Sequence, residues 1–125
     1  MNDELSEADI RSEKIEEWQK LLAGGVGYAD AYGIMTGRAE WGGKLKWFPE
    51  NMHGGIARWV LFGIVPGDFL QAVIRGDLFE AAARADDINQ GLLFDYCKFL
   101  YNCVPGDCYG SPEAFAVHQA KGGMF

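Results

Sequence analysis

Apolar residues in the first part of the chain recur at helical spacing and form one narrow stripe. Ile15, Trp18 and Leu22 fall on the same face of a helix, and most positions between them are charged. Ser6 suits an N-cap, because its hydroxyl can accept a hydrogen bond from the first helical turn. The pattern predicts a helix over residues 6–23. A narrow stripe favours a helix that lies on the surface of the domain, and a helix offered to a partner is the alternative.

The next part of the chain, residues 24–55, contains nine glycines and has a different pattern. Within it, residues 38–47 alternate polar and apolar side chains on both sides of Gly42-Gly43, which is typical of a hairpin. A three-residue loop beginning at this Gly-Gly would pair Trp41 with Leu45 and place the apolar side chains on one face. We therefore expect a small β-hairpin near residues 38–47.

One nine-residue phrase occurs twice in succession, beginning at Gly67-Asp68 and again at Gly76-Asp77. Each copy reads Gly-Asp, two large apolar residues, a polar residue, Ala, two apolar residues and Arg. Aspartate is a strong N-cap, and the preceding glycine suits the end of an earlier helix. The repeat predicts two short helices, 68–75 and 77–86, that meet at Gly76.

From residue 51 onward the pattern is helical, and residues 89–103 have the widest apolar face. Ser111-Pro112 is typical of the start of a last helix. The fold class that we expect is mainly α with a small β-hairpin (α+β), with five to six helices and the 89–103 helix central. We expect a single domain over residues 1–125, with a helical core at 51–121 and frayed ends at 1–5 and 122–125.

Length and charge narrow the function classes. A chain of 125 residues is long enough for one well-filled core. Its formal charge of −7 argues against direct nucleic-acid binding, which needs cations to neutralise phosphates. The acidic surface either is merely solvated or docks on a basic partner protein. An acidic N-terminus, no long apolar run and an odd number of cysteines predict a cytoplasmic protein with no membrane association.

Candidate catalytic and metal-binding residues are few. Cys97, Cys103, Cys108 and His118 are residue types that zinc accepts, but their spacing matches no tight zinc motif, so roles in the core are favoured. A dyad of Cys108 and His118 stays open, because the sequence does not show which residues are close in space. We predict a protein that is not an enzyme and that needs no cofactor and no metal.

Several phrases between residues 59 and 112 form a longer pattern. They are Pro66-Gly67-Asp68-Phe69-Leu70-Gln71-Ala72-Val73, Asp77-Leu78, Ala85-Asp86-Asp87-Ile88-Asn89, Phe99-Leu100-Tyr101-Asn102 and Cys108-Tyr109-Gly110-Ser111. This stretch resembles a family of small uncharacterised proteins encoded by bacteriophages and prophages, in which tryptophan stands at the position of Tyr109. The resemblance implies a phage context and no particular reaction.

A small acidic phage-type protein without catalytic motifs suggests an accessory factor that binds and occludes a host protein. The hypothesis is an inhibitor of a bacterial defence system such as CRISPR or restriction. The candidate partner-binding residues lie on the first helix and in the expected hairpin: Glu7, Asp9, Glu13, Glu16, Glu17, Trp41, Lys44 and Trp47. The alternative is a module that sequesters a small molecule or nucleotide, with an anion held in the 24–55 region by Arg38, Lys44, Lys46 and Arg58.

Overall fold

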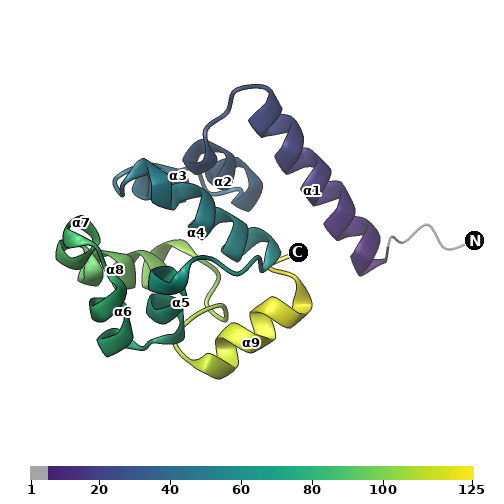
Figure 1. The fold of residues 1–125 in the computed structure, drawn as a ribbon. Helices are drawn as coiled ribbons and strands as arrows, with labels where there is room; N and C mark the ends of the chain where they lie inside the picture. The colour runs from purple at the N-terminus through teal and green to yellow at the C-terminus, as the bar shows by residue number, and fades with distance from the viewer. Residues whose placement is uncertain (1–5) are drawn as a thin grey trace, which may run out of the picture.

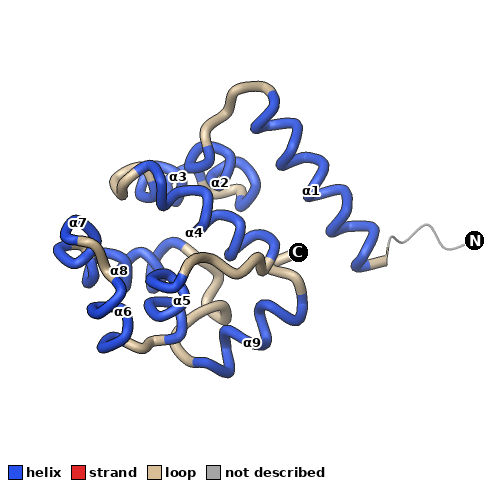
Figure 2. The backbone as a smooth tube through the Cα atoms, viewed as in Figure 1, coloured by secondary structure: helices blue, strands red, loops and turns tan. Residues whose placement is uncertain are grey.

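The computed structural model describes residues 6–125, and this part of the chain is all-helical (Figures 1 and 2). It contains nine helices and no strand. α4 runs through the middle of the molecule, with α1 on one side and α5 to α8 on the other (Figure 1). The helices are α1 (Glu7–Ala23), α2 (Tyr28–Thr36), α3 (Ala39–Leu45), α4 (Glu50–Phe62), α5 (Asp68–Arg75), α6 (Leu78–Arg84), α7 (Asp87–Gly91), α8 (Leu93–Cys103) and α9 (Pro112–Lys121).

The expected hairpin at residues 38–47 is wrong, because this segment forms α3. Gly42 is buried where α3 crosses α2. A Cβ atom added at Gly42 would lie 2.5 Å from the carbonyl oxygen of Ala29 and 3.1 Å from the Cα of Gly33. The glycine pair therefore allows two helix backbones to approach each other, which is a different use from a tight turn. Residues 6–125 are all-helical rather than α+β, and the nine helices there exceed the five to six that we expected.

The expectation of a central helix at 89–103 is also wrong. Residues 87–103 are divided at Leu92 into α7 and α8, and α8 has four buried residues. In contrast, α4 has eight buried residues, including Trp59, which is fully buried and stacks on Phe115 of α9. The helix at the centre of the core is α4.

The repeated phrase forms α5 and α6, two separate helices on either side of Gly76. Gly76 has φ +79°, and a Cβ there would lie 2.7 Å from the carbonyl oxygen of Gly110, so only glycine fits this bend. Asp77 caps α6 by accepting a hydrogen bond from the Glu80 N–H. Asp68 does not cap α5 in the same way, because the N-cap residue of α5 is Gly67.

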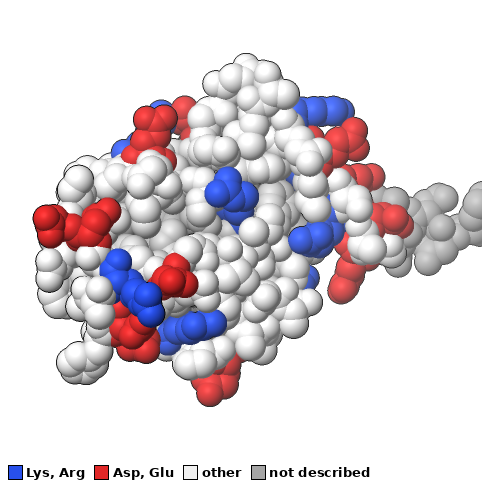
Figure 3. Space-filling model, viewed as in Figure 1, with Lys and Arg blue, Asp and Glu red and all other residues white. Residues whose placement is uncertain are grey.

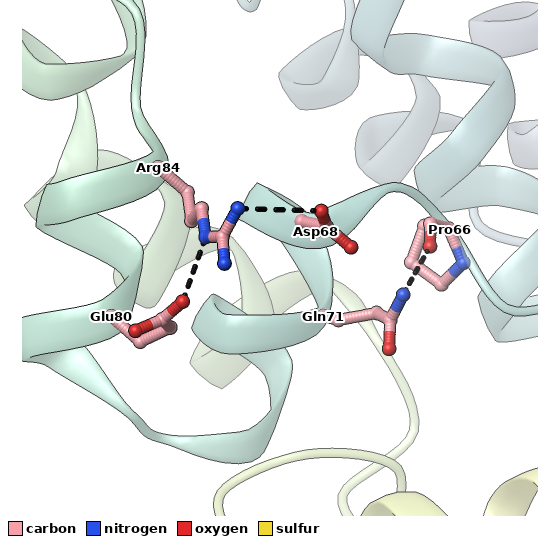
Figure 4. Close-up of polar contacts among 5 residues, drawn as sticks. All are labelled: Pro66, Asp68, Gln71, Glu80 and Arg84. Atoms are coloured by element: carbon pink, nitrogen blue, oxygen red, sulfur yellow. Dashed lines mark hydrogen bonds and ion pairs between the residues drawn. The ribbon is translucent and has the colours of Figure 1, made fainter.

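Asp68 instead forms an ion pair with the arginine that ends the second copy of the phrase (Figure 4). The Arg84 guanidinium lies 3.7 Å from the Asp68 carboxylate, and its Nε donates to Glu80 at 2.7 Å. On the other side of α5, the Gln71 amide donates to the carbonyl of Pro66 at 2.8 Å. The aspartate of the first copy is thus joined to the arginine of the second.

Residues 122–125, which we expected to fray, lie against the end of α4. Gly123 is buried, and the Met124 N–H donates to the Val60 carbonyl at 3.1 Å. Arg11 of α1 donates from Nε to the Gly122 carbonyl and from Nη2 to the Phe62 carbonyl, each at 3.0 Å. One guanidinium therefore ties α1, the end of α4 and the C-terminal segment together.

Candidate functional site

A groove of about 530 Å³ lies between α3 and α8, and we call it the α3–α8 groove. Its α8 wall consists of residues spaced i, i+3, i+4, i+7 and i+8, which is one face of a helix. The opposite wall comes from the end of α3 and the turn that follows. The lining residues are Gly43, Lys44, Trp47 and Phe48 on one side, and Asp95, Lys98, Phe99, Asn102 and Cys103 on the other.

The floor of the α3–α8 groove is apolar. Phe48 and Phe99 are both buried, and their rings meet edge to face with centroids 5.6 Å apart. Trp47 packs edge-on against Phe48 at 5.4 Å, yet 63% of it remains exposed. A buried aromatic floor beside an exposed indole is a surface suited to hold an apolar side chain of another molecule.

Two lysines lie at the edge of this groove, and neither has a partner in the described part of the chain. Of the eleven lysines and arginines, eight form an ion pair, a side-chain hydrogen bond to a backbone carbonyl or a contact with an aromatic ring. Among residues 6–125, Lys44, Lys98 and Lys121 have no such contact, and two of the three line the groove. Asp95 is the one acidic residue of the lining, so the groove carries a net positive charge in a chain of net charge −7.

The most exposed large apolar side chains lie at the α3–α8 groove or on α6, α7 and α8. Apart from Trp47, they are carried by α6, α7 and α8, which follow one another with short links (Figure 1). We call these four residues the α6–α8 flank. They are Phe79 (93% exposed), Phe94 (77%), Tyr101 (77%) and Ile88 (66%).

The predicted partner-binding residues fall into two separate sets. Glu7, Asp9, Glu13, Glu16 and Glu17 are all exposed on α1, and Figure 3 shows acidic side chains along that edge. Glu16 and Glu17 each lie 3.5 Å from a lysine of the same helix. In Figure 1, α1 lies on the side of α4 opposite to α6 and α8. The structure therefore does not bring the α1 carboxylates together with Lys44 and Trp47, which line the groove against α8.

The three predicted residues of the 38–47 segment differ in their surroundings. Lys44 and Trp47 line the α3–α8 groove. Trp41 is half-buried instead, with its ring stacked on Tyr32 at 6.4 Å and the Arg38 guanidinium 5.4 Å from its centroid. Trp41 thus fills a place between α2 and α3. Whether Lys44 and Trp47 bind a partner stays a prediction.

The glycine-rich region forms a second hollow, of about 680 Å³, near the starts of α2 and α4. Of the four cations proposed to hold an anion in this region, only Lys46 lines the hollow, and it forms an ion pair with Asp30 at 2.7 Å. Glu50 also lines it. The ring Nε2 of His53 donates to the Phe48 carbonyl at 2.7 Å. These charges leave no excess positive charge for an anion.

A third hollow, of about 540 Å³, brings together residues of two of the phrases quoted above, those at 66–73 and 85–89. Asp68 and Asp86 both line it, but each carboxylate already has a structural partner. Asp86 caps α7 by accepting from the Asn89 N–H at 2.7 Å, and Asn89 accepts a hydrogen bond from the Tyr96 hydroxyl. These motif residues therefore build turns and helix starts.

Cys108 and His118 do not form a catalytic dyad in the structure, because each side chain bonds to backbone carbonyls rather than to the other. The Cys108 thiol donates to the Pro105 carbonyl at 3.2 Å, and burial raises the pKa of this thiol to about 12. His118 Nε2 faces the carbonyls of Trp59 and Val60. A protonated, buried thiol without a base is unreactive near neutral pH. Within residues 6–125, no three His, Cys, Asp or Glu side chains are grouped so that they could hold a metal ion.

Sequence reasoning missed Phe94, Lys98 and Tyr101. They are spaced i, i+4 and i+7, so they share the side of α8 that faces away from the buried Tyr96, Phe99 and Leu100. That spacing is visible in the sequence. From the sequence we considered only the apolar face of 89–103 that we expected to be buried, and we did not consider the opposite face.

The chain matches no family model, no curated protein and no solved structure with which it was compared. None of the helices described is long and apolar enough to cross a membrane. Function therefore has to be argued from the site itself. The α3–α8 groove offers an apolar floor and two ammonium groups that have no ion-pair partner within residues 6–125, a combination that can bind another molecule.

Proposed function

We propose that this chain is a non-enzymatic protein-binding module, and that the α6–α8 flank with the α3–α8 groove is its binding surface. One observation carries the proposal: the five most exposed large apolar side chains, Trp47 among them, lie on the flank and at the groove. Scattered apolar residues are normal on a protein surface, but a concentration of exposed aromatics is typical of interfaces. Four of these five are aromatic, the residue class that most often anchors a partner.

The kind of partner that we propose comes from the phrases in residues 59–112, which resemble phage-encoded proteins. On that basis the partner is a protein of a bacterial host. Occlusion of a defence complex, such as a CRISPR or restriction complex, is the specific form of this proposal. The flank supports contact with a protein surface in general and does not distinguish one host factor from another.

The first test removes the aromatic side chains of the flank. The host protein is first captured from a bacterial lysate on the immobilised wild-type chain and purified. A variant carrying Phe79→Ser, Phe94→Ser and Tyr101→Ser should bind this protein at least about ten-fold more weakly than the wild type, a loss of about 1.4 kcal/mol in binding free energy. The matched control carries Ile34→Ser and Val117→Ser, which are 54% and 60% exposed and lie on α2 and α9. Isothermal titration calorimetry with the partner measures both, and thermal unfolding confirms that each variant folds. Equal affinity of the flank variant and the wild type would contradict the proposed surface.

Binding of a small anionic molecule is the second candidate function, and one observation favours it. The α3–α8 groove has a volume in the usual range for ligand pockets, together with an aromatic floor and two lysines. A thermal-shift screen over a panel of nucleotides tests it. If the chain binds a nucleotide, that nucleotide should raise the unfolding temperature of the wild type, and Lys44→Glu should abolish the increase. The absence of a thermal shift with every nucleotide tested would contradict this function.

A further inference from the structure

We propose that the α3–α8 groove binds a segment of the partner that carries a large apolar side chain beside acidic residues. This inference rests on the proposed function and names the chemistry of the partner at one part of the surface. The apolar side chain would lie on Phe48 and Phe99, next to the Trp47 indole. The acidic side chains would meet the ammonium groups of Lys44 and Lys98.

Charge complementarity is the first argument for this occupant. Lys44 and Lys98 have no ion-pair partner within residues 6–125, although acidic residues outnumber basic ones by seven in the whole chain. An acidic segment is repelled by most of this surface and attracted at the groove, which fixes where it docks. A basic segment would place like charges against both lysines, which costs binding energy.

The shape of the groove is the second argument. The α8 wall runs from Asp95 to Cys103, which spans about 12 Å at the helical rise per residue. That length suits two turns of a helix or about four residues of an extended segment. Asp95 disfavours an acidic side chain near its own carboxylate. The acidic residues of the segment should therefore lie nearer Lys98 and Lys44.

The acidic α1 of a second copy is a poorer occupant. It has the required acidic residues, but Trp18, the largest apolar side chain of α1, is buried and packs against Phe62 with ring centroids 5.9 Å apart. The helix therefore cannot offer this anchor without leaving its own core.

Selection from a peptide library tests the inference. The full chain is immobilised and screened with random 12-residue peptides displayed on phage, and enriched peptides are then synthesised. We expect enriched sequences to combine Asp or Glu with Leu, Phe or Trp. They should bind a Lys44→Glu, Lys98→Glu variant at least ten-fold more weakly than the wild type, and a Lys44→Arg, Lys98→Arg variant should keep most of the affinity.

The matched control is a Lys20→Glu, Lys121→Glu variant, which makes the same change in net charge away from the groove. It should bind the selected peptides as the wild type does. Circular dichroism and thermal unfolding show whether each variant is folded. Affinity should also fall as salt is raised, because the ion pairs at the groove edge are exposed to solvent.

Several results would overturn the inference. They are the absence of any enriched peptide, enrichment of basic peptides, or equal binding to the wild type and the Lys44→Glu, Lys98→Glu variant. Stabilisation by ATP that exceeds that by any selected peptide would assign the groove to a small anion. A dimer in sedimentation experiments that the same variant abolishes would assign it to a second copy.

The two proposals can fail separately. If the flank variant no longer binds the host protein but the Lys44→Glu, Lys98→Glu variant still does, the proposed protein-binding function stands. The proposal that the groove binds an acidic segment is then wrong. If neither variant affects capture of the host protein, the proposed binding surface is wrong as well.

Discussion

The two ring nitrogens of His118 have different surroundings in the core. Nε2 lies 2.8 Å from the Trp59 carbonyl and 3.1 Å from the Val60 carbonyl, so it must carry the proton and donate. Nδ1 is buried and has no hydrogen-bond partner among the described residues. A second proton on the ring would be placed on Nδ1, where no atom of residues 6–125 accepts it. Burial, the main cause, lowers the pKa of His118 below its usual value.

This arrangement predicts that stability falls in mild acid. Between the lowered pKa of His118 in the folded chain and its ordinary value of about 6.5 in the unfolded chain, the unfolded chain binds more protons. The contribution of the neutral His118 to the free energy of unfolding should therefore be complete above about pH 6.5. It should decrease as the pH is lowered below that value. Urea unfolding at pH 7.5, 6.5 and 5.5 measures this slope.

The control for this prediction is His118→Gln, whose amide can still donate to a carbonyl but does not titrate. The variant should lose most of the pH dependence in that window, whatever its absolute stability. A wild-type protein with the same slope as the variant would show that His118 is not the group responsible.

Adjacent glycines in α3 have opposite environments, which makes the helix itself testable. Gly42 faces α2, where an added Cβ would meet the Ala29 carbonyl oxygen at 2.5 Å. Gly43 is exposed, and an added Cβ would meet no atom within 4 Å. Gly42→Ala should lower the free energy of unfolding by about 1–3 kcal/mol through overpacking. Gly43→Ala should raise it by up to about 1 kcal/mol, because alanine is the better helix former.

Denaturant unfolding of the two variants checks the signs. If Gly42-Gly43 formed a hairpin turn, Gly43→Ala would lower the free energy of unfolding, because alanine is strained in the left-handed conformation that such a turn requires. Destabilisation by Gly43→Ala would therefore contradict the helix at this position.

Helices with strong local signals could be predicted from the sequence, and those that depend on distant contacts could not. Ser6, Asp77 and Ser111 each accept a hydrogen bond from the N–H three residues later, and each marks the start of a helix where expected. The α2–α3 crossing had no such signal. Its glycines are explained by a contact between two helices, and alternation around Gly-Gly is equally typical of a hairpin.

The same division holds for the candidate site. Lys44 and Trp47 were selected from a local pattern, although the pattern was assigned to the wrong element. Lys98 could not be joined to them from the sequence, because its position beside Lys44 depends on how α8 packs against α3. The α1 carboxylates were selected from charge alone, which does not show which face of the molecule they occupy.

Arg11 connects parts of the molecule that are far apart in the chain. Its guanidinium donates to Gly122 and Phe62, and both carbonyls are close to the end of α4. Arg11→Met keeps the aliphatic part of the side chain and removes both charged hydrogen bonds. It should lower the free energy of unfolding by about 1–3 kcal/mol, because two carbonyls lose their donor.

Urea unfolding measures this change, with Lys20→Met on the same helix as the control. Lys20 forms an exposed ion pair with Glu16, so its loss should change stability by less than about 0.5 kcal/mol. Hydrogen exchange should also be faster at Met124 in Arg11→Met. Equal stability of the two variants would show that the guanidinium does not hold the C-terminal segment in place.

The exposure of Trp47 also has a practical consequence. Trp18 and Trp59 are buried and Trp41 is half-buried, so Trp47 is the one indole that lies mainly in water. Indole fluorescence shifts to shorter wavelength when water around the ring is replaced by apolar groups. The molecule therefore carries its own optical reporter at the groove, and its emission spectrum can follow complex formation without an attached dye.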